Sequence, residues 1–379
     1  MAKIDTVTPR YGYIDALRGW AITGVIVYHV GQVFPGPIWP LTDVARLGVE
    51  GVQLFFVVSA MTLMMSWHAR DDGAVPFWLR RLFRIAPMFW IAIVFFVMLN
   101  EMNPAGWDIG PFDVLLAFLF LHGWSFPAMN HVVPFGWTVG AEMMFYAVFP
   151  LLARFITTLS RAILFVAAAW LISAEANSLF TEAAITWPGD DLRGYLTWWP
   201  FNALPGFATG CLVYHLLPLA PRSWAMAFCL RAAAACLMLF CIVHPMYQYS
   251  NWFHPLARPV IVAPSCALFI LSLANRPAPL FVNGVTRFAG RVSYSAYLLH
   301  VLAVDQVVAY RHWIHQIPLA SAVVFALACL AAMAVTFAAS SVAYRRIERP
   351  AIELGTRLIR RWTSGKIWDS PEGSRRNGP

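Results

Sequence analysis

Long apolar runs separated by short polar segments follow one another along almost the whole chain. The hydrocarbon core of a bilayer is about 30 Å thick, so a helix needs about 20 predominantly apolar residues to cross it. Ten runs approach or reach this length, near residues 17–34, 48–67, 86–100, 137–156, 161–175, 198–217, 224–243, 257–274, 292–310 and 318–343. They predict an all-α fold, a polytopic transmembrane helical bundle of about ten spans.

An eleventh apolar stretch, residues 112–124, would extend only about 20 Å as a helix and is too short to cross alone. Cytoplasmic loops carry an excess of Lys and Arg. With Lys3 and Arg10 inside, a crossing at 112–124 would put Arg154 and Arg161 outside and invert every later loop. We therefore predict a re-entrant or outer-surface segment there, with both termini in the cytoplasm.

Composition supports the membrane assignment. The chain of 379 residues is 60% apolar and 12% charged, whereas soluble domains are about half apolar and a quarter charged. The net charge of +8 is explained by basic cytoplasmic loops, so we expect no nucleic-acid partner. The six cysteines lie in apolar runs without a CxxC pair, which predicts neither a disulfide framework nor a metal cofactor. We expect one transmembrane domain over 1–350, followed by a cytoplasmic basic helix and disordered tail over 351–379.

A charge near the bilayer centre costs about 2.5–3.5 kcal/mol, so ionisable residues in spans are functional candidates. Arg18 and His29 are eleven residues apart and therefore share one face of the first span. Their rise of about 16 Å places Arg18 at the cytoplasmic boundary and His29 near mid-depth. The alternatives are a snorkelling arginine and a histidine that makes an interhelical hydrogen bond.

Two later spans carry further polar groups. Glu142 lies in WTVGAEMMFY, where Tyr146 follows one turn later on the same face, at hydrogen-bonding spacing. In SYSAYLLH, Ser293, Tyr297 and His300 form a polar stripe at i, i+4, i+7 spacing. His300 is expected at a depth close to that of His29, and helix packing is the alternative explanation of the stripe.

Arginines gather at the predicted cytoplasmic boundary. The segment FWLRRLFRIAP contains Arg80, Arg81 and Arg84, and Arg287 and Arg291 fall on the same side. Topology alone would explain this cluster. Arginine also presents a planar fork to phosphate oxygens, so the cluster is equally typical of a polyphosphate site.

Several of these segments, in this order, resemble the motifs of the acyltransferase 3 family of polytopic membrane acyltransferases. YIDALRGWAITGVIVYH is similar to its first-helix motif, in which a His follows an Arg after ten residues. The further similar blocks are GVQLFFVVSAMTL, RRLFRIAP, GWTVGAEMMFYAVFP, SYSAYLLH and YRRIERP. The chain departs from the family at Ala60, where Gly is usual, and at Met143, where many members have a second acidic residue. The resemblance is to O-acetyltransferase members without an SGNH-type domain.

The resemblance implies transfer of an acyl group, most simply acetyl, from cytoplasmic acetyl-CoA to an acceptor hydroxyl. The acceptor would be a surface polysaccharide or lipid-linked sugar of the cell envelope, reached across the bacterial inner membrane, with membrane lipid as the surrounding partner. The residues carried over as essential are Arg18, His29, Arg81, Arg84 and Glu142.

From these residues we predict a mechanism. His29 is the expected general base, and Glu142 would orient His29 or hold the acceptor. Tyr297, Ser59 or His300 would stabilise the oxyanion. A covalent relay through His29 or Ser59 is an alternative to direct transfer. The arginines expected to bind CoA are Arg18, Arg81 and Arg84, with Arg80, Arg287 and Arg291 as further candidates.

A secondary transporter of an anionic solute or of protons is the alternative function. Such proteins bind substrate between discontinuous, Gly- or Pro-interrupted helices of two matching halves. The segment WWPFNALPGFATG, with Pro200, Pro205 and Gly206, fits a broken helix. No internal repeat accompanies it, which favours the acyltransferase.

Overall fold

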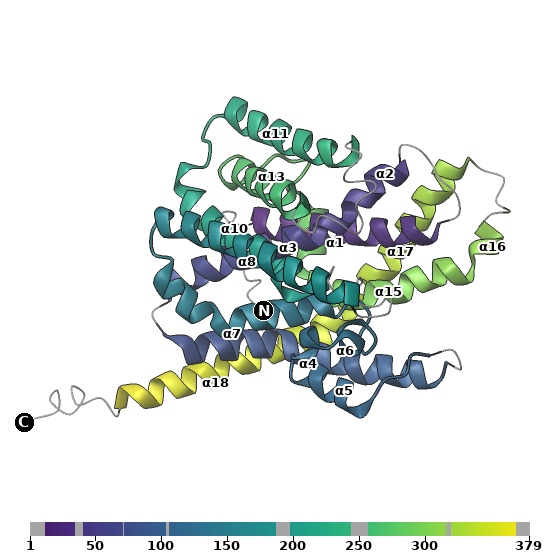
Figure 1. Cartoon of the computed structure of the whole chain (residues 1–379), viewed down its shortest axis with the longest axis horizontal. Helices are drawn as coiled ribbons and strands as arrows, with labels where there is room; N and C mark the ends of the chain where they lie inside the picture. The colour runs from purple at the N-terminus through teal and green to yellow at the C-terminus, as the bar shows by residue number, and fades with distance from the viewer. Residues whose placement is uncertain are drawn as a thin grey trace, which may run out of the picture.

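The computed structural model describes residues 12–34, 41–70, 72–103, 106–186, 198–243, 257–314, 316 and 320–368, and the regular elements of this part of the chain are helical (Figure 1). The helices are α1 (Gly12–Val33), α2 (Leu41–Arg46), η2 (Leu47–Glu50), α3 (Gly51–His68), α4 (Ala74–Glu101), α5 (Pro111–Phe118), η3 (His122–Trp124), α6 (Phe126–Asn130), α7 (Trp137–Phe155), α8 (Leu159–Thr186), α10 (Pro200–Leu216), η4 (Leu217–Leu219), α11 (Trp224–Val243), α13 (Ala257–Ala274), α14 (Gly284–Arg291), α15 (Ser293–Ala309), α16 (Arg311–Ile314), α17 (Ser321–Ala343), η5 (Tyr344–Glu348) and α18 (Arg349–Trp368).

Each of the ten predicted runs falls on a helix, namely α1, α3, α4, α7, α8, α10, α11, α13, α15 and α17. Six helical segments of the described chain are long and apolar enough to cross a membrane, or seven if α14 and α15, which meet at a bend of 85°, form one span. A helical membrane protein is thus confirmed, whereas the number of ten spans is not. Length is one physical reason, because α10 has only 17 residues and the apolar part of α13 runs only from Ile261 to Ala274.

The predicted short segment at 112–124 becomes α5 and η3. At 1.5 Å per residue the 8 residues of α5 rise about 12 Å, less than half of the bilayer core. The Asp113 carboxylate accepts hydrogen bonds from the backbone N–H of Gly110 and from Ser125 Oγ, both at 3.2 Å. This carboxylate ties the start of α5 to the turn that follows it, so the segment folds back beside α4 and α6 and does not cross alone.

Helix α1 lies at the centre of the bundle and contacts α3, α14, α15 and α17. Its contact with α14 is close enough to require glycine on both sides. A Cβ on Gly290 would lie 1.7 Å from the carbonyl oxygen of Asp15, and a Cβ on Gly19 would lie 2.1 Å from that of Thr286. The two backbones therefore touch, which fixes α1 against the bent pair α14–α15.

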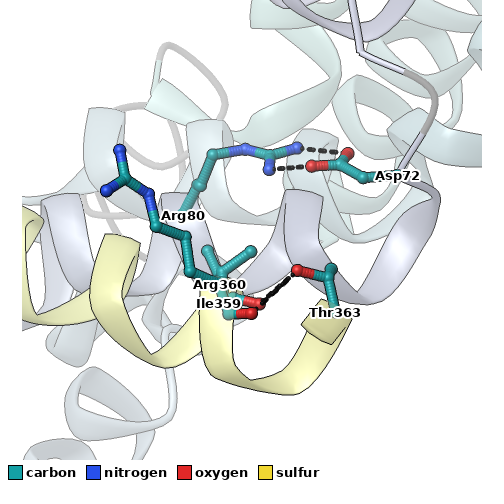
Figure 2. A network of polar contacts seen from close by, with 5 residues as sticks. All are labelled: Asp72, Arg80, Ile359, Arg360 and Thr363. Carbon is teal, nitrogen blue, oxygen red and sulfur yellow. Dashed lines mark hydrogen bonds and ion pairs between the residues drawn. The ribbon is translucent and has the colours of Figure 1, made fainter. Parts of the chain in front are cut away.

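The C-terminal elements α17, η5 and α18 run on as one helical segment, Ser321–Thr363. Helix α18 packs along the first part of α4, where Gly355 faces Phe83 and Ile359 is buried. Figure 2 shows this contact region, where α18 carries Thr363, whose hydroxyl donates to the carbonyl oxygen of Ile359 at 3.0 Å. The predicted basic helix after residue 350 thus has a helical counterpart, while the predicted tail beyond 368 lies outside the described residues.

Candidate functional site

One pocket gathers most of the residues that the sequence singles out. It opens among α1, α3, α4, α7 and α15 and has about 710 Å³ of empty volume, its open mouth included. Its lining consists of Arg18, Val52, Phe55, Phe56, Ser59, Arg81, Arg84, Ile85, Thr138, Val139, Glu142, Tyr146, Ser293, Tyr294 and Tyr297.

Three half-buried arginines give the pocket its positive charge. Arg18 Nη2 donates to Thr62 Oγ1 at 3.1 Å, and Thr62 Oγ1 donates to the carbonyl oxygen of Ser59 at 2.9 Å. The guanidinium carbon of Arg81 lies 5.6 Å from the centre of the Tyr146 ring, and its Nε is buried without a hydrogen-bond partner. Arg84 is the third arginine that lines the pocket. Such a group of guanidinium ions, with an unused buried donor among them, is suited to an anion rich in oxygen acceptors.

The pocket also holds a carboxylate cluster. Ser59 Oγ donates to Glu142 Oε1 at 2.6 Å, and the Tyr146 hydroxyl donates to the same oxygen in a very short hydrogen bond. The predicted pairing of Glu142 with Tyr146 is therefore confirmed. Both of these bonds are made by Oε1 of Glu142. The expected orientation of His29 by Glu142 stays a prediction.

Two histidines meet beside the pocket. The ring centres of His29, on α1, and His300, on α15, are 5.2 Å apart, and the Phe135 ring lies 4.2 Å and 5.6 Å from them. Tyr297 lines the pocket, and its ring centre lies 5.6 Å from that of His300. The histidines thus meet at similar depth, as the sequence predicted, and Tyr297 connects them to the arginine pocket.

The hydrogen bond of His300 defines its tautomer. Its Nδ1 lies 2.6 Å from the carbonyl oxygen of Tyr297. A carbonyl oxygen can only accept, so Nδ1 carries the hydrogen. In the neutral ring Nε2 is then a pure acceptor, and this atom is buried without a partner.

Arg80, Arg287 and Arg291 do not line the pocket. Arg80 makes two hydrogen bonds, of 2.5 and 2.9 Å, with the Asp72 carboxylate (Figure 2). These bonds hold the pKa of the Asp72 carboxyl below its usual range. Arg287 donates from Nε to the carbonyl oxygen of Asn283 at 3.2 Å, and Arg287 and Arg291 are both exposed. The 85° bend between α14 and α15 separates these two arginines from the pocket-lining residues of α15.

Sequence reasoning missed several residues of this region. Thr62, which holds Arg18, lies three residues after Ser59, so helical spacing was a usable signal. Tyr294, whose hydroxyl donates to the carbonyl oxygen of Ile85 at 2.8 Å, lies inside a segment already noted. Glu348 is buried and accepts a hydrogen bond from the backbone N–H of Ser295 at 3.0 Å. No local pattern joins two residues 53 positions apart, so this contact could not be predicted.

Within the part of the chain that the structure describes, no group of three or more His, Cys, Asp or Glu side chains is placed to hold a metal ion. The described site therefore consists of arginines, hydroxyl groups, one carboxylate and two imidazoles. These groups can bind an anion, move a proton and donate hydrogen bonds to a developing negative charge.

Comparison with known proteins agrees with this chemistry. A family profile described as an acyltransferase domain matches residues 11–341. The chain is 28% identical to the acyltransferase MdmB of Streptomyces mycarofaciens over an alignment of 383 residues, which covers 91% of this chain and 92% of the relative. It is 24% identical to the O-acetyltransferase OatA of Staphylococcus aureus over 326 residues, which cover 77% of this chain and 50% of that protein. No solved structure matches the chain.

Proposed function

This chain belongs to the acyltransferase-domain family and is a membrane acyltransferase, and we propose that it moves an acetyl group from cytoplasmic acetyl-CoA to a hydroxyl of an extracytoplasmic glycan or lipid-linked carbohydrate. The observation that carries the proposal is the meeting of three arginines, a carboxylate–hydroxyl cluster and a histidine pair around one pocket. The similarity to relatives named acyltransferase and O-acetyltransferase supports it and favours an enzyme over a transporter.

The three pocket arginines would hold the phosphates of the acyl-CoA donor. Arg81 supports this role best, because its buried Nε lacks a partner and a phosphate oxygen would supply one. Arg18 is held by Thr62 and would add a second charge-assisted contact. Arg80, Arg287 and Arg291 are not among the residues that line the pocket, so the proposal assigns the donor phosphates to Arg18, Arg81 and Arg84.

His29 would act as the general base, because a neutral imidazole nitrogen with a free lone pair can take the proton of the acceptor hydroxyl. The acceptor oxygen attacks the thioester carbonyl carbon while His29 takes the hydroxyl proton. The proton then passes to the CoA sulfur as the C–S bond breaks, which leaves an O-acyl ester and a free thiol. Neutral His300 has no N–H on Nε2, and Ser59 Oγ donates to Glu142 in a bond of 2.6 Å. The Tyr297 hydroxyl donates to the carbonyl oxygen of Phe135 in a longer bond of 3.3 Å. Tyr297 would therefore turn most readily to stabilise the oxyanion.

The test is thioester cleavage and acceptor acetylation by the purified protein in lipid nanodiscs, with acetyl-CoA and an extracted glycan or glycolipid fraction. Mass spectrometry of surface glycans and lipids from cells with and without the protein would identify the acceptor. We expect His29→Ala to lose about 10²- to 10⁴-fold in kcat, the usual contribution of a general base. Retained activity in this variant would overturn the assignment of the base. Acetyl label on Ser59 in the absence of acceptor would replace direct transfer by the covalent route.

We further propose that the protein lies in the bacterial inner membrane with both termini in the cytoplasm. The arginines of the pocket then face the compartment that supplies acyl-CoA. The division into a catalytic part over 1–350 and a cytoplasmic basic extension over 351–379 belongs to the same proposal, and the match to residues 11–341 is compatible with it.

A further inference from the structure

His29 has a side-chain partner that none of the motifs includes. Its Nδ1 lies 3.2 Å from Gln32 Oε1, one turn further along α1. The amide nitrogen of Gln32 donates to the Tyr28 hydroxyl at 2.7 Å. Since the amide nitrogen is used in this way, the amide oxygen is the atom that faces the histidine. The Gln32 side chain therefore bridges the Tyr28 hydroxyl and the His29 imidazole.

This contact decides which nitrogen of His29 can accept a proton. An amide oxygen can only accept a hydrogen bond, so the hydrogen of neutral His29 lies on Nδ1. Its Nε2 then carries the free lone pair that a general base needs. Without such a partner the hydrogen can move to Nε2, and the ring in that form presents no lone pair there.

Catalytic histidines commonly receive this orientation from a third group, often a carboxylate. Here Glu142 is engaged by Ser59 and Tyr146. Gln32 is uncharged, and its amide oxygen accepts from His29 without placing a second carboxylate on α1. We propose that Gln32 is a positioning residue that holds His29 in the Nδ1–H tautomer with Nε2 free for the acceptor hydroxyl. This inference rests on the proposed function, in which His29 is the base.

The titratable surroundings of His29 are limited. Among the described residues, the titratable side chains in ring contact with it are Tyr28 on α1, at 4.9 Å between ring centres, and His300 on α15, at 5.2 Å. Helices α2 and α17 approach α1 at Gly31 with Ala45 and Phe325, which are apolar. A change in the partner of Nδ1 should therefore act on His29 without passing through another charged group.

The experiment compares Gln32→Leu with Gln32→Glu in nanodiscs. Leucine has no acceptor, so kcat should fall about ten- to a hundredfold, a part of the 10²–10⁴ that a general base contributes, with KM for acetyl-CoA unchanged. Glutamate keeps an acceptor oxygen, so kcat above neutral pH should stay close to that of the unchanged protein. Its carboxylate also favours the protonated, inactive imidazolium, so the acid limb of the kcat/KM profile should move to higher pH.

Gln306 on α15 supplies a matched control. It is also exposed, and its side chain has no hydrogen bond within the described part of the chain. Gln306→Leu and Gln306→Glu should leave both kcat and the pH profile unchanged. Thermal unfolding of each variant shows whether it is folded, and if Gln32→Leu is unstable, the profile of Gln32→Glu alone decides.

The two proposals fail in different ways. An active His29→Ala variant would remove the base itself and with it the proposed mechanism. An inactive His29→Ala variant together with unchanged kcat in Gln32→Leu, or an unmoved profile in Gln32→Glu, would leave the base in place and overturn the role of Gln32.

Discussion

Arg81 and Glu142 line the same pocket with opposite charges, and we expect Arg81 to bind the donor and Glu142 to act in the transfer step. Arg81 has an unpartnered buried Nε, whereas Glu142 has two hydroxyl donors on one oxygen. We expect Arg81→Ala to raise KM for acetyl-CoA about ten- to a hundredfold, because a hydrogen bond to a charged group contributes about 1.5–3 kcal/mol. Glu142→Gln removes a negative charge near the phosphates. It should lower kcat without raising that KM.

Initial rates over a range of acetyl-CoA concentrations separate these two effects. Tyr146→Phe is the matched variant, since it removes one donor to Glu142 and leaves the charge of the carboxylate unchanged. A rise of KM in Glu142→Gln as large as that in Arg81→Ala would contradict the division of tasks, because Glu142 would then contribute to donor binding.

At the scale of elements, the π-helical turn η5 sets the position of α15. It places the buried carboxylate of Glu348 at the first turn of α15, where the carboxylate accepts from both the backbone N–H and the hydroxyl of Ser295. A negative charge is favourable at a helix N-terminus. Tyr297 and His300 follow on the same helix, so this contact lies directly upstream of the site residues of α15.

We expect Glu348→Ala to lower the free energy of unfolding by about 1–3 kcal/mol, because it leaves buried donors of Ser295 without an acceptor. Glu348→Gln keeps one acceptor oxygen and should cost less. Glu353→Ala is the control, since its ion pair with Arg349 is exposed and such pairs contribute about 0.3–0.5 kcal/mol. The measurement is thermal unfolding in detergent. Equal losses for Glu348→Ala and Glu353→Ala would show that the contact does not hold α15.

Across the whole molecule, the sequence predicts the positions of the helices better than the contacts between them. Burial in lipid requires apolar side chains, so the runs were visible, and fixed helical spacing put Tyr146 beside Glu142. The bend between α14 and α15 and the π-turn depend on contacts between separate elements, which no local pattern encodes. Arg80 pairs with Asp72, eight residues earlier in the turn before α4, and helical spacing does not cover a partner that lies outside the helix. The sequence therefore predicts one site with six candidate arginines, and the structure places three of them around the pocket.

The path of the chain through the membrane gives the last prediction. If α5 and the turn after it fold back without crossing, Asp108, before α5, lies outside, and Thr158, after α7, lies in the cytoplasm. In a background with the six native cysteines replaced, a membrane-impermeant maleimide should label Asp108→Cys in intact cells. It should label Thr158→Cys and Glu353→Cys only after permeabilisation. All three positions are exposed, so a cysteine that stays unlabelled in intact cells is shielded by the membrane and not by burial in the protein. Labelling of Thr158→Cys from outside would mean that the chain crosses once more between Asp108 and Thr158. The positive-inside arrangement and the cytoplasmic C-terminus would then both be wrong.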